Sequence, residues 1–105
     1  MFKIVNSPIK LGNQTIRNRT VSSPVSINKA NENGEVTDNI ISFFSNLSKN
    51  NLGMITIGAV SVSEEGTDTK NGMRIGQDIY FDGLKKLASE IKKHGAKSSI
   101  QLFHV

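Results

Sequence analysis

The sequence predicts an α/β fold in which parallel strands alternate with helices, and three observations lead to this. Two segments have the three- and four-residue apolar spacing of helices that bury one face. Short segments that favour strands lie before, between and after them, and the middle one, residues 54–62, begins almost continuously apolar, as strands do when both sheet faces are covered. The order strand, helix, strand, helix, strand needs crossover connections, which favour a parallel sheet.

A β-hairpin is expected before these elements. Residues 9–11 and 15–17 alternate in polarity on either side of Gly12-Asn13-Gln14, which predicts a three-residue turn. The first strand of the main sheet follows at residues 20–23, because Pro24 has no N–H to donate to a ladder.

The two helices have recognisable ends. Thr37 is the expected N-cap of a helix that runs to about residue 49, and Ile40, Phe44 and Leu47 form its apolar stripe. The second helix is expected over residues 79–94, with Gly95 as its C-terminal stop. Between the second strand and this helix, the polar segment 63–78 is long for a connection without its own structure, which indicates a functional loop.

The third strand is expected over residues 97–105, where the chain ends on apolar residues. Such a strand expects a neighbour, either in a doubly wound sheet or in a closed barrel of eight strands, which typically needs about 250 residues. With 105 residues, the chain is expected to be the truncated opening part of a larger parallel fold.

Composition narrows the classes of function. The formal charge is +4, but the lysines near the second helix share it with Glu90 and no aromatic residues are interleaved, so a solvated helix face is favoured over a nucleic-acid site. The longest apolar run, residues 54–60, is far shorter than the roughly 20 residues of a membrane span. With no cysteine in the chain, a thiolate metal site is excluded and a cytoplasmic location is the default expectation.

The candidate chemistry lies where the strands end, because ligands gather at the carboxyl ends of parallel strands in both architectures. The segments concerned are 23–26, 58–61 and 101–104. Taken singly, Ser26 has a structural explanation as a turn cap, and Gln101 as a partner for backbone groups. No Walker loop, no G-x-G-x-x-G motif and no histidine pair at metal-ligand spacing is present.

Taken together, these segments resemble the opening of the old yellow enzyme family of FMN-dependent oxidoreductases. The resemblance is carried, in order, by residues 7–13, 18–26, 33–38, 53–62, 83–87, 94–97 and 101–104. The last of these is similar to the start of the family's Gln-Leu-x-His-x-Gly-Arg segment, and the matches extend over essentially the whole chain. The resemblance implies the N-terminal hairpin, first three strands and two helices of a parallel (β/α)8 TIM barrel, with residues 1–105 forming the N-terminal part of a single FMN-binding domain.

The resemblance also implies roles for the residues after the first strand. Ser23, Pro24, Val25 and Ser26 would lie along the flavin ring, with Pro24 and Val25 making backbone contacts. The Ser26 hydroxyl, at a position where the family usually has Thr or Cys, would donate to the flavin carbonyl next to N5.

Four further residues are implied by the same resemblance. Ala59 would contact the ring edge through its backbone, and Gln101 would offer its amide to the pyrimidine portion. Asn28 and Phe103 would lie on the substrate side. The family differs at some positions, since Asn28 stands near a common tyrosine and Gly76 where many members have tryptophan, so the substrate class is left open.

The implied parent function is FMN-dependent transfer of hydride from NAD(P)H to a small-molecule acceptor, an activated alkene or a similar electron-poor compound. No catalytic or metal-binding residue is assigned here, because the family's substrate-anchoring His/His or His/Asn pair and its phosphate site come after the position of Val105. A dienoyl-CoA reductase-like member with further cofactor domains is one alternative. A second alternative is a non-catalytic fragment, or a segment that associates with a partner supplying the remaining strands. For the full-length parent, a homo-oligomer is one expected state.

Overall fold

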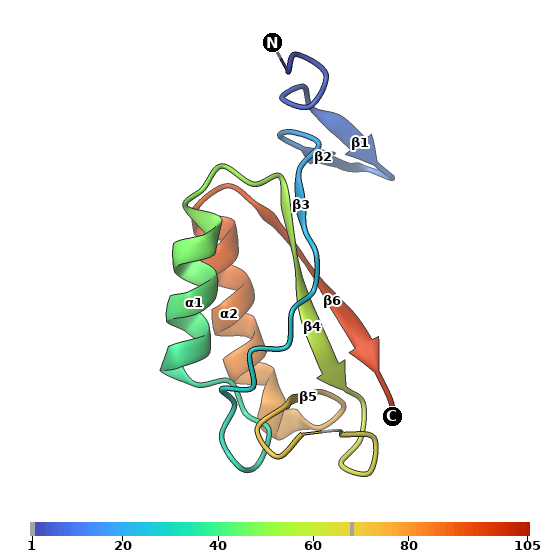
Figure 1. Ribbon diagram of the computed structural model, residues 1–105, viewed down its shortest axis with the longest axis vertical. Coiled ribbons are helices and arrows are strands. Elements are labelled where there is room, and N and C mark those ends of the chain that lie inside the picture. The colour runs from blue at the N-terminus through green and yellow to red at the C-terminus, as the bar shows by residue number, and fades with distance from the viewer. Residues whose placement is uncertain (1, 68) are drawn as a thin grey trace.

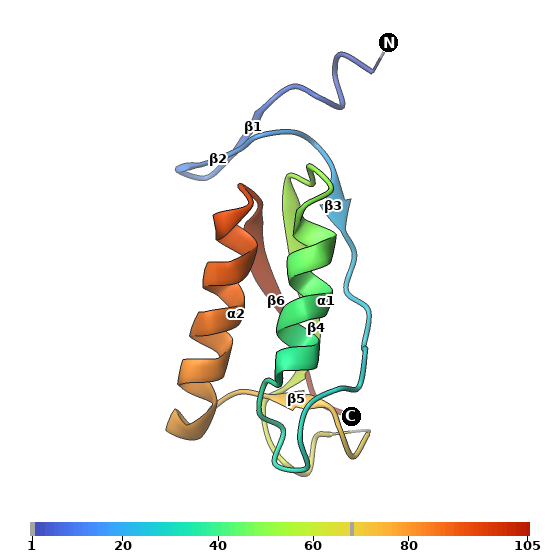
Figure 2. The same cartoon turned by 90° about the vertical axis from the view of Figure 1, so that its left-hand side faces the viewer.

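A computed structural model describes residues 2–67 and 69–105 of the chain, which form an open sheet with two helices on one face (Figures 1 and 2). The elements in chain order are β1 (Ile9–Leu11), β2 (Gln14–Ile16), β3 (Val21–Ser22), α1 (Asp38–Ser48), β4 (Met54–Ser61), β5 (Met73–Arg74), the 3-10 turn η1 (Asp78–Tyr80), α2 (Phe81–Lys93) and β6 (Lys97–Phe103). No helix among these residues is both long enough and apolar enough to cross a membrane.

Strand β4 is the centre of the main sheet. Strand β6 pairs with it in parallel over its whole length, from Met54 opposite Lys97 to Ser61 opposite Phe103. On the other edge of β4, β3 pairs in parallel with its first residues and β5 with its last residues. The predicted parallel α/β order is therefore confirmed.

The hydrophobic core lies between the sheet and the helices. Ile55 and Ile57 of β4 are buried against Ile40 of α1 and against Leu87 and Ile91 of α2, and none of these is more than 2% exposed. Each such side chain contributes roughly 1.5–3 kcal/mol by leaving water. Because alternate strand residues point to opposite faces, Met54 and Thr56 are left half-buried on the face without helices.

Both helix ends follow from local chemistry. Thr37 is confirmed as the N-cap of α1, since its side-chain oxygen accepts a hydrogen bond from the Ile40 N–H at 3.4 Å. Gly95 ends α2 at φ +89°, where its N–H donates to the Lys92 carbonyl at 2.9 Å. α2 itself begins at Phe81, two residues later than expected, because residues 78–80 form the 3-10 turn.

Two predictions about connections are wrong. Leu11 pairs with Gln14, so the hairpin turn has two residues and not three. Gly12 makes this possible with φ +61°, the conformation that a type II′ turn needs at its first central position. The segment 63–78 does have structure of its own, since Met73 is 5% exposed in the core and anchors β5 against the end of β4.

Candidate functional site

Strands β4 and β6 end together at the carboxyl edge of the sheet, where their arrows end in Figure 1, whereas β3 ends earlier, with Ser22 opposite Ile55 near the start of β4. Beyond Ser22 the chain continues extended through Pro24 and leaves the ladder. This extended segment runs alongside β4, so that Pro24 comes close to Gly58 and Ser26 to Ala59. The three segments in which the sequence predicts site residues are therefore neighbours in space.

A β-bulge shapes the middle of this edge. Ile57 pairs with Ile100, but the next pair is Val60 with Leu102, so Gly58 and Ala59 together face the single residue Gln101. An extra residue of this kind bends the strand and redirects side chains, and bulges are common beside active sites. The bulge falls on the predicted residues Ala59 and Gln101.

Gly58 allows the segment after β3, strand β4 and strand β6 to approach closely. A Cβ atom placed on Gly58 would lie 2.8 Å from the Cβ of Gln101 and 3.1 Å from the Cβ of Pro24. Both distances are shorter than ordinary van der Waals contact. Glycine at this position thus brings Pro24 and Gln101 together across β4.

Ser26 is tied to the bulge by a hydrogen bond. The Ala59 N–H donates to the Ser26 Oγ at 3.1 Å, although the two residues are 33 positions apart in sequence. Within residues 2–67 and 69–105, no acceptor receives the Ser26 O–H. The hydroxyl therefore keeps a donor at the exposed edge while its oxygen is held in place.

Gln101 presents its carboxamide to solvent. The residue is exposed, and its side chain makes no hydrogen bond to the described part of the chain. A carboxamide offers two N–H donors and one oxygen acceptor, all of which are open here. Ser26 and Gln101 thus supply uncharged donors and acceptors from opposite sides of β4.

The side chains of Ser23 and Val25 point toward α1 and not toward the carboxyl edge. Their side chains line a groove beside α1, together with Phe43 and Leu47. This follows from the extended chain, in which alternate side chains point to opposite sides. Ser23 and Val25 therefore reach the edge of the sheet through their backbone.

The two residues predicted on the substrate side are held by the loop after β4. Asn28 has φ +49° and its Oδ1 accepts a hydrogen bond from the Thr69 Oγ1 at 3.0 Å. The carbonyl of Phe103 accepts from the Val62 N–H at 3.1 Å. Phe103 lies two residues after Gln101, so both side chains point to the same face of β6.

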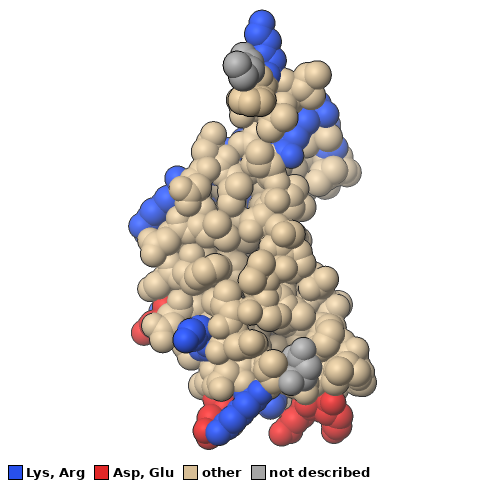
Figure 3. All heavy atoms as spheres, in the orientation of Figure 1, with Lys and Arg blue, Asp and Glu red and all other residues tan. Residues whose placement is uncertain are grey.

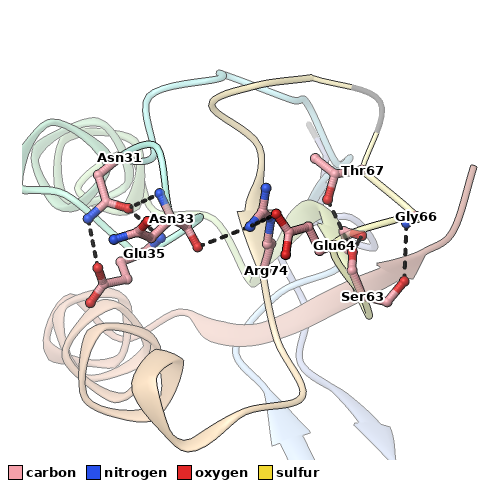
Figure 4. A network of polar contacts seen from close by, with 9 residues as sticks. Asn31, Asn33, Glu35, Ser63, Glu64, Gly66, Thr67 and Arg74 are labelled. Carbon is pink, nitrogen blue, oxygen red and sulfur yellow. Dashed lines mark hydrogen bonds and ion pairs between the residues drawn. The ribbon is translucent and has the colours of Figure 1, made fainter.

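Sequence reasoning missed Thr69 and Arg74 in this loop. Arg74 lies between the loops that follow β3 and β4, as Figure 4 shows. The signal was the pair Met73-Arg74, an apolar and a polar residue with strand-like alternation within an otherwise polar segment.

The distribution of charged side chains and the cavities limit which other binding sites the described residues offer. Most side chains on the face in Figure 3 are uncharged. No cluster of three metal-ligating side chains occurs in the part of the chain that the structure describes. A cavity of about 490 Å³ lies beside α2, but its lining includes Phe81, Leu84 and Ile100 and none of the predicted site residues.

Comparisons with known proteins agree on one family. The model of the NADH:flavin oxidoreductase / NADH oxidase family matches residues 5–105. An NADPH dehydrogenase of Bacillus cytotoxicus is 33% identical over 99 residues, which are 93% of this chain and 29% of that protein. The chain thus spans less than a third of the length of this relative.

Solved structures of this family have the same fold. The old yellow enzyme of Pichia sp. AKU4542 superimposes with a TM-score of 0.90 at 27% identity, over 97% of this chain and 26% of that chain. A 2-naphthoyl-CoA reductase in complex with 2-naphthoyl-CoA superimposes with a TM-score of 0.93 at 28% identity, over 99% of this chain and 16% of that chain. The described elements therefore match the N-terminal part of these barrels.

Proposed function

Because the chain belongs to the NADH:flavin oxidoreductase / NADH oxidase family, we propose that it forms the N-terminal part of an FMN-dependent barrel enzyme that transfers hydride from NAD(P)H to an activated alkene or a similar electron-poor acceptor. The observation that carries the proposal is the meeting of Ser26, the Gly58-Ala59 bulge and Gln101 at the carboxyl edge of the sheet. This edge is where parallel β/α folds bind their ligands.

The residues at this edge fit a flavin ring in their chemistry. An isoalloxazine ring has carbonyl and ring-nitrogen acceptors and one N–H donor, so it needs uncharged hydrogen-bonding partners on one side. The Ser26 hydroxyl has an open donor, and the Gln101 carboxamide has both donors and an acceptor. Pro24 has no N–H that the ring would leave buried without a partner.

Each residue has a definite task in this proposal. The Ala59 N–H holds the Ser26 oxygen, so that the hydroxyl hydrogen is directed elsewhere, to the flavin carbonyl next to N5. Gln101 binds the pyrimidine portion, while Ser23 and Val25 contribute backbone. When bound, FMN supplies the hydride chemistry, and these side chains bind and orient it.

The first test is flavin retention. We expect the 105-residue chain, purified with added FMN and passed over a gel-filtration column, to lose the flavin absorbance, because three strands form only part of a barrel that binds ring and phosphate. The complete polypeptide, read from the nucleotide sequence beyond Val105, should stay yellow and oxidise NADPH or NADH. Stoichiometric flavin on the 105-residue chain would contradict the proposal that the site needs the later strands.

A second candidate function is that of a longer, CoA-ester-reducing member with further cofactor domains, similar to dienoyl-CoA reductases. It is supported by the 2-naphthoyl-CoA reductase, which superimposes over 99% of this chain although the chain is only 16% of it. The length of the complete reading frame separates the two candidates. A frame of about the barrel's size, roughly 250 residues or somewhat more, favours the single-domain enzyme.

The non-catalytic alternative makes a different prediction. Leu102 on the edge of β6 is 62% exposed, and an open strand edge pairs readily with another chain. We expect the 105-residue chain to self-associate or to be poorly folded, because the third strand and the helix stripes lack their neighbours. Light scattering after gel filtration and thermal unfolding test this, and a monomer with a sharp cooperative transition would contradict it. A stop codon directly after Val105, together with a stable complex with a partner that supplies strands, would favour this alternative over the enzyme.

The enzyme proposal includes two further expectations. The complete protein forms homo-oligomers, and it is located in the cytoplasm.

A further inference from the structure

Arg74 is a mostly buried cation between two exposed loops. Its side chain is 12% exposed, whereas the carboxylate of Glu64, its ion-pair partner at 3.8 Å, is 80% exposed. The Nη1 donates to the Asn33 carbonyl at 3.5 Å. The buried Nε has no partner in the described part of the chain. A guanidinium enclosed in this way needs a reason beyond surface charge, because burying an incompletely paired cation costs free energy.

The backbone is shaped to receive this side chain. Gly34 has φ +84°, and a Cβ atom placed on it would lie 2.5 Å from the Cγ of Arg74. The Arg74 N–H also donates to the Gly34 carbonyl at 3.0 Å. The aliphatic part of Arg74 therefore lies directly on the backbone of the loop that follows β3.

The two loops that Arg74 joins are each folded by their own hydrogen bonds (Figure 4). In loop 31–35, the Asn31 Oδ1 accepts from the Glu35 N–H at 2.9 Å. In loop 63–67, the Ser63 Oγ accepts from the Gly66 N–H at 3.1 Å. Each loop is thus a compact unit, and Arg74 lies between the two units.

The residues that flank loop 63–67 contact the predicted substrate-side residues, since Val62 donates to the Phe103 carbonyl and Thr69 to Asn28. Loop 63–67 is bound to the end of β6, because the Val105 N–H donates to the Gly66 carbonyl at 3.1 Å. Asn71 makes two bonds to Ala30, and Thr69 donates to Asn28. Residues 63–67 and 69–74, which end at Arg74, therefore contact both the Asn28 side and the β6 side of the carboxyl edge.

We propose that Arg74 is a positioning residue for the acceptor side of the site, which joins loops 31–35 and 63–67 and thereby places Asn28 and Phe103. The placement of the loops is independent of any ligand, and its consequence for the acceptor rests on the proposed function.

A second ion pair joins loop 31–35 to Lys70, which lies between loop 63–67 and β5, and provides a matched control. Lys70 lies 2.8 Å from Glu32, but the two side chains are 74% and 77% exposed. Exposed pairs of this kind contribute little to stability. Arg74→Met and Lys70→Met remove a cation and keep an unbranched apolar chain, so they differ in burial more than in chemistry.

The first experiment is native-state hydrogen exchange on the complete polypeptide without added FMN. In Arg74→Met, the Ala30 and Gly66 amides should exchange about tenfold faster, as expected when charge-assisted hydrogen bonds are lost. Amides of β4 and β6, and every amide in Lys70→Met, should exchange as in the unaltered chain. Unchanged exchange at both loops would overturn the proposal, and so would faster exchange throughout the sheet, because Arg74 would then support the core as a whole.

The second experiment uses the complete FMN-loaded enzyme with cyclohex-2-enone as a simple activated alkene. Arg74→Met should raise KM for this acceptor about fivefold to tenfold with kcat, flavin affinity and the flavin absorption spectrum unchanged, because the loops contribute to binding and not to the chemical step. An unchanged KM, or a loss of kcat at unchanged KM, would overturn the acceptor-side role. If the complete unaltered enzyme neither binds FMN nor reduces the probe, the proposed function fails, while the exchange experiment still decides whether Arg74 positions the loops.

Discussion

The amino and carboxyl edges of the sheet use their polar side chains in opposite ways. At the amino edge, Asn18 is 4% exposed and its carboxamide is bonded on both sides, to the Thr20 N–H at 3.0 Å and to the Asn51 carbonyl at 2.7 Å. At the carboxyl edge, the Gln101 carboxamide is exposed and has no side-chain partner among the described residues. The same functional group therefore supports the structure at one edge and is open to a ligand at the other.

Arg17 and Arg74 extend the comparison. Arg17 donates to the Leu52 carbonyl at 3.0 Å and to the His94 carbonyl at 2.9 Å, so it satisfies the backbone after both helices. Arg74 joins two loops with longer contacts of 3.5 and 3.8 Å. In β/α barrels the amino edge serves stability and the carboxyl edge serves function, and the polar side chains of this chain differ between its two edges in the same sense.

The largest expected effect tests the two carboxamides directly. Asn18→Ala should lower the free energy of unfolding by about 3 kcal/mol, because it leaves the Thr20 N–H and the Asn51 carbonyl without partners in a buried site. Gln101→Ala should change it by less than about 0.5 kcal/mol, as exposed substitutions do. Urea denaturation of the complete polypeptide measures both, and equal losses would remove the distinction between the edges.

Two glycines sharpen the comparison at the level of the backbone. A Cβ atom on Gly53 would lie within contact of the Asn18 carbonyl oxygen, a backbone atom that cannot move aside, whereas on Gly58 it would meet the Gln101 and Pro24 side chains. Gly53→Ala should therefore cost about 2 kcal/mol and Gly58→Ala about 1 kcal/mol, within the range for overpacking.

The result that tests this comparison is which of the two glycine variants loses more free energy of unfolding. Thermal or urea unfolding of both variants gives it. A larger loss for Gly58→Ala would mean that the carboxyl edge is as rigid as the amino edge. In the complete enzyme, Gly58→Ala should also weaken flavin binding, because it displaces Gln101.

Ser26 tests whether the open donor at the carboxyl edge serves a flavin. Losing a typical hydrogen bond changes the free energy by roughly 0.5–1.5 kcal/mol, and about 1.4 kcal/mol corresponds to about 30 mV for a two-electron couple. Since the bond favours the reduced, more electron-rich ring, Ser26→Ala should lower the potential of the complete enzyme by roughly 10–30 mV. A redox titration against a reference dye measures the shift.

The matched control for Ser26 is Ser89→Ala, on the exposed face of α2. It should leave the potential unchanged. Flavin reduction by NAD(P)H should slow in Ser26→Ala alone, while reoxidation by the acceptor should hold or quicken. If the potential and both rates stay the same in Ser26→Ala, the serine only supports the bulge through Ala59.

The smallest expected effect is a pH dependence near the amino edge. The Ser45 hydroxyl donates to the Glu90 carboxylate at 2.9 Å and so joins α1 to α2. This hydrogen bond lowers the pKa of Glu90 below 4.5. Burial raises the pKa and opposes this effect, whereas the charge of Lys93 adds to the lowering. Because the pKa is lower in the folded chain, the stability that it contributes is present above about pH 4.5 and is lost as the pH falls further.

Unfolding curves between pH 7 and pH 3 test this sign. Glu90→Gln should be slightly less stable than the unaltered chain at neutral pH, and the difference should shrink below pH 4.5. A difference that grows on acidification would show that Glu90 is stabilised in its protonated form.

Much of the fold could be predicted because its signals are local. The helix stripes, the Thr37 cap and the Gly95 stop depend on residues within a few positions of each other, and the structure confirms them. The hairpin turn was assigned one residue too many, because polarity alternation alone does not settle the register and Gly12 permits the tighter turn. The short strand β5 escaped detection, since two residues carry too little periodicity to stand out in a polar segment.

The sequence by itself determined the order of the main strands and helices, and the segments in which the three main strands end. Only the tertiary structure decided how those strand ends meet: the register shift that sets Gly58 and Ala59 opposite Gln101, the bond from Ala59 to Ser26, and the place of Arg74 between two loops. Local elements follow from backbone preferences and apolar spacing within a few residues. Contacts between residues 33 and 41 positions apart depend on how whole strands and loops pack, and a single sequence carries no direct signal of that.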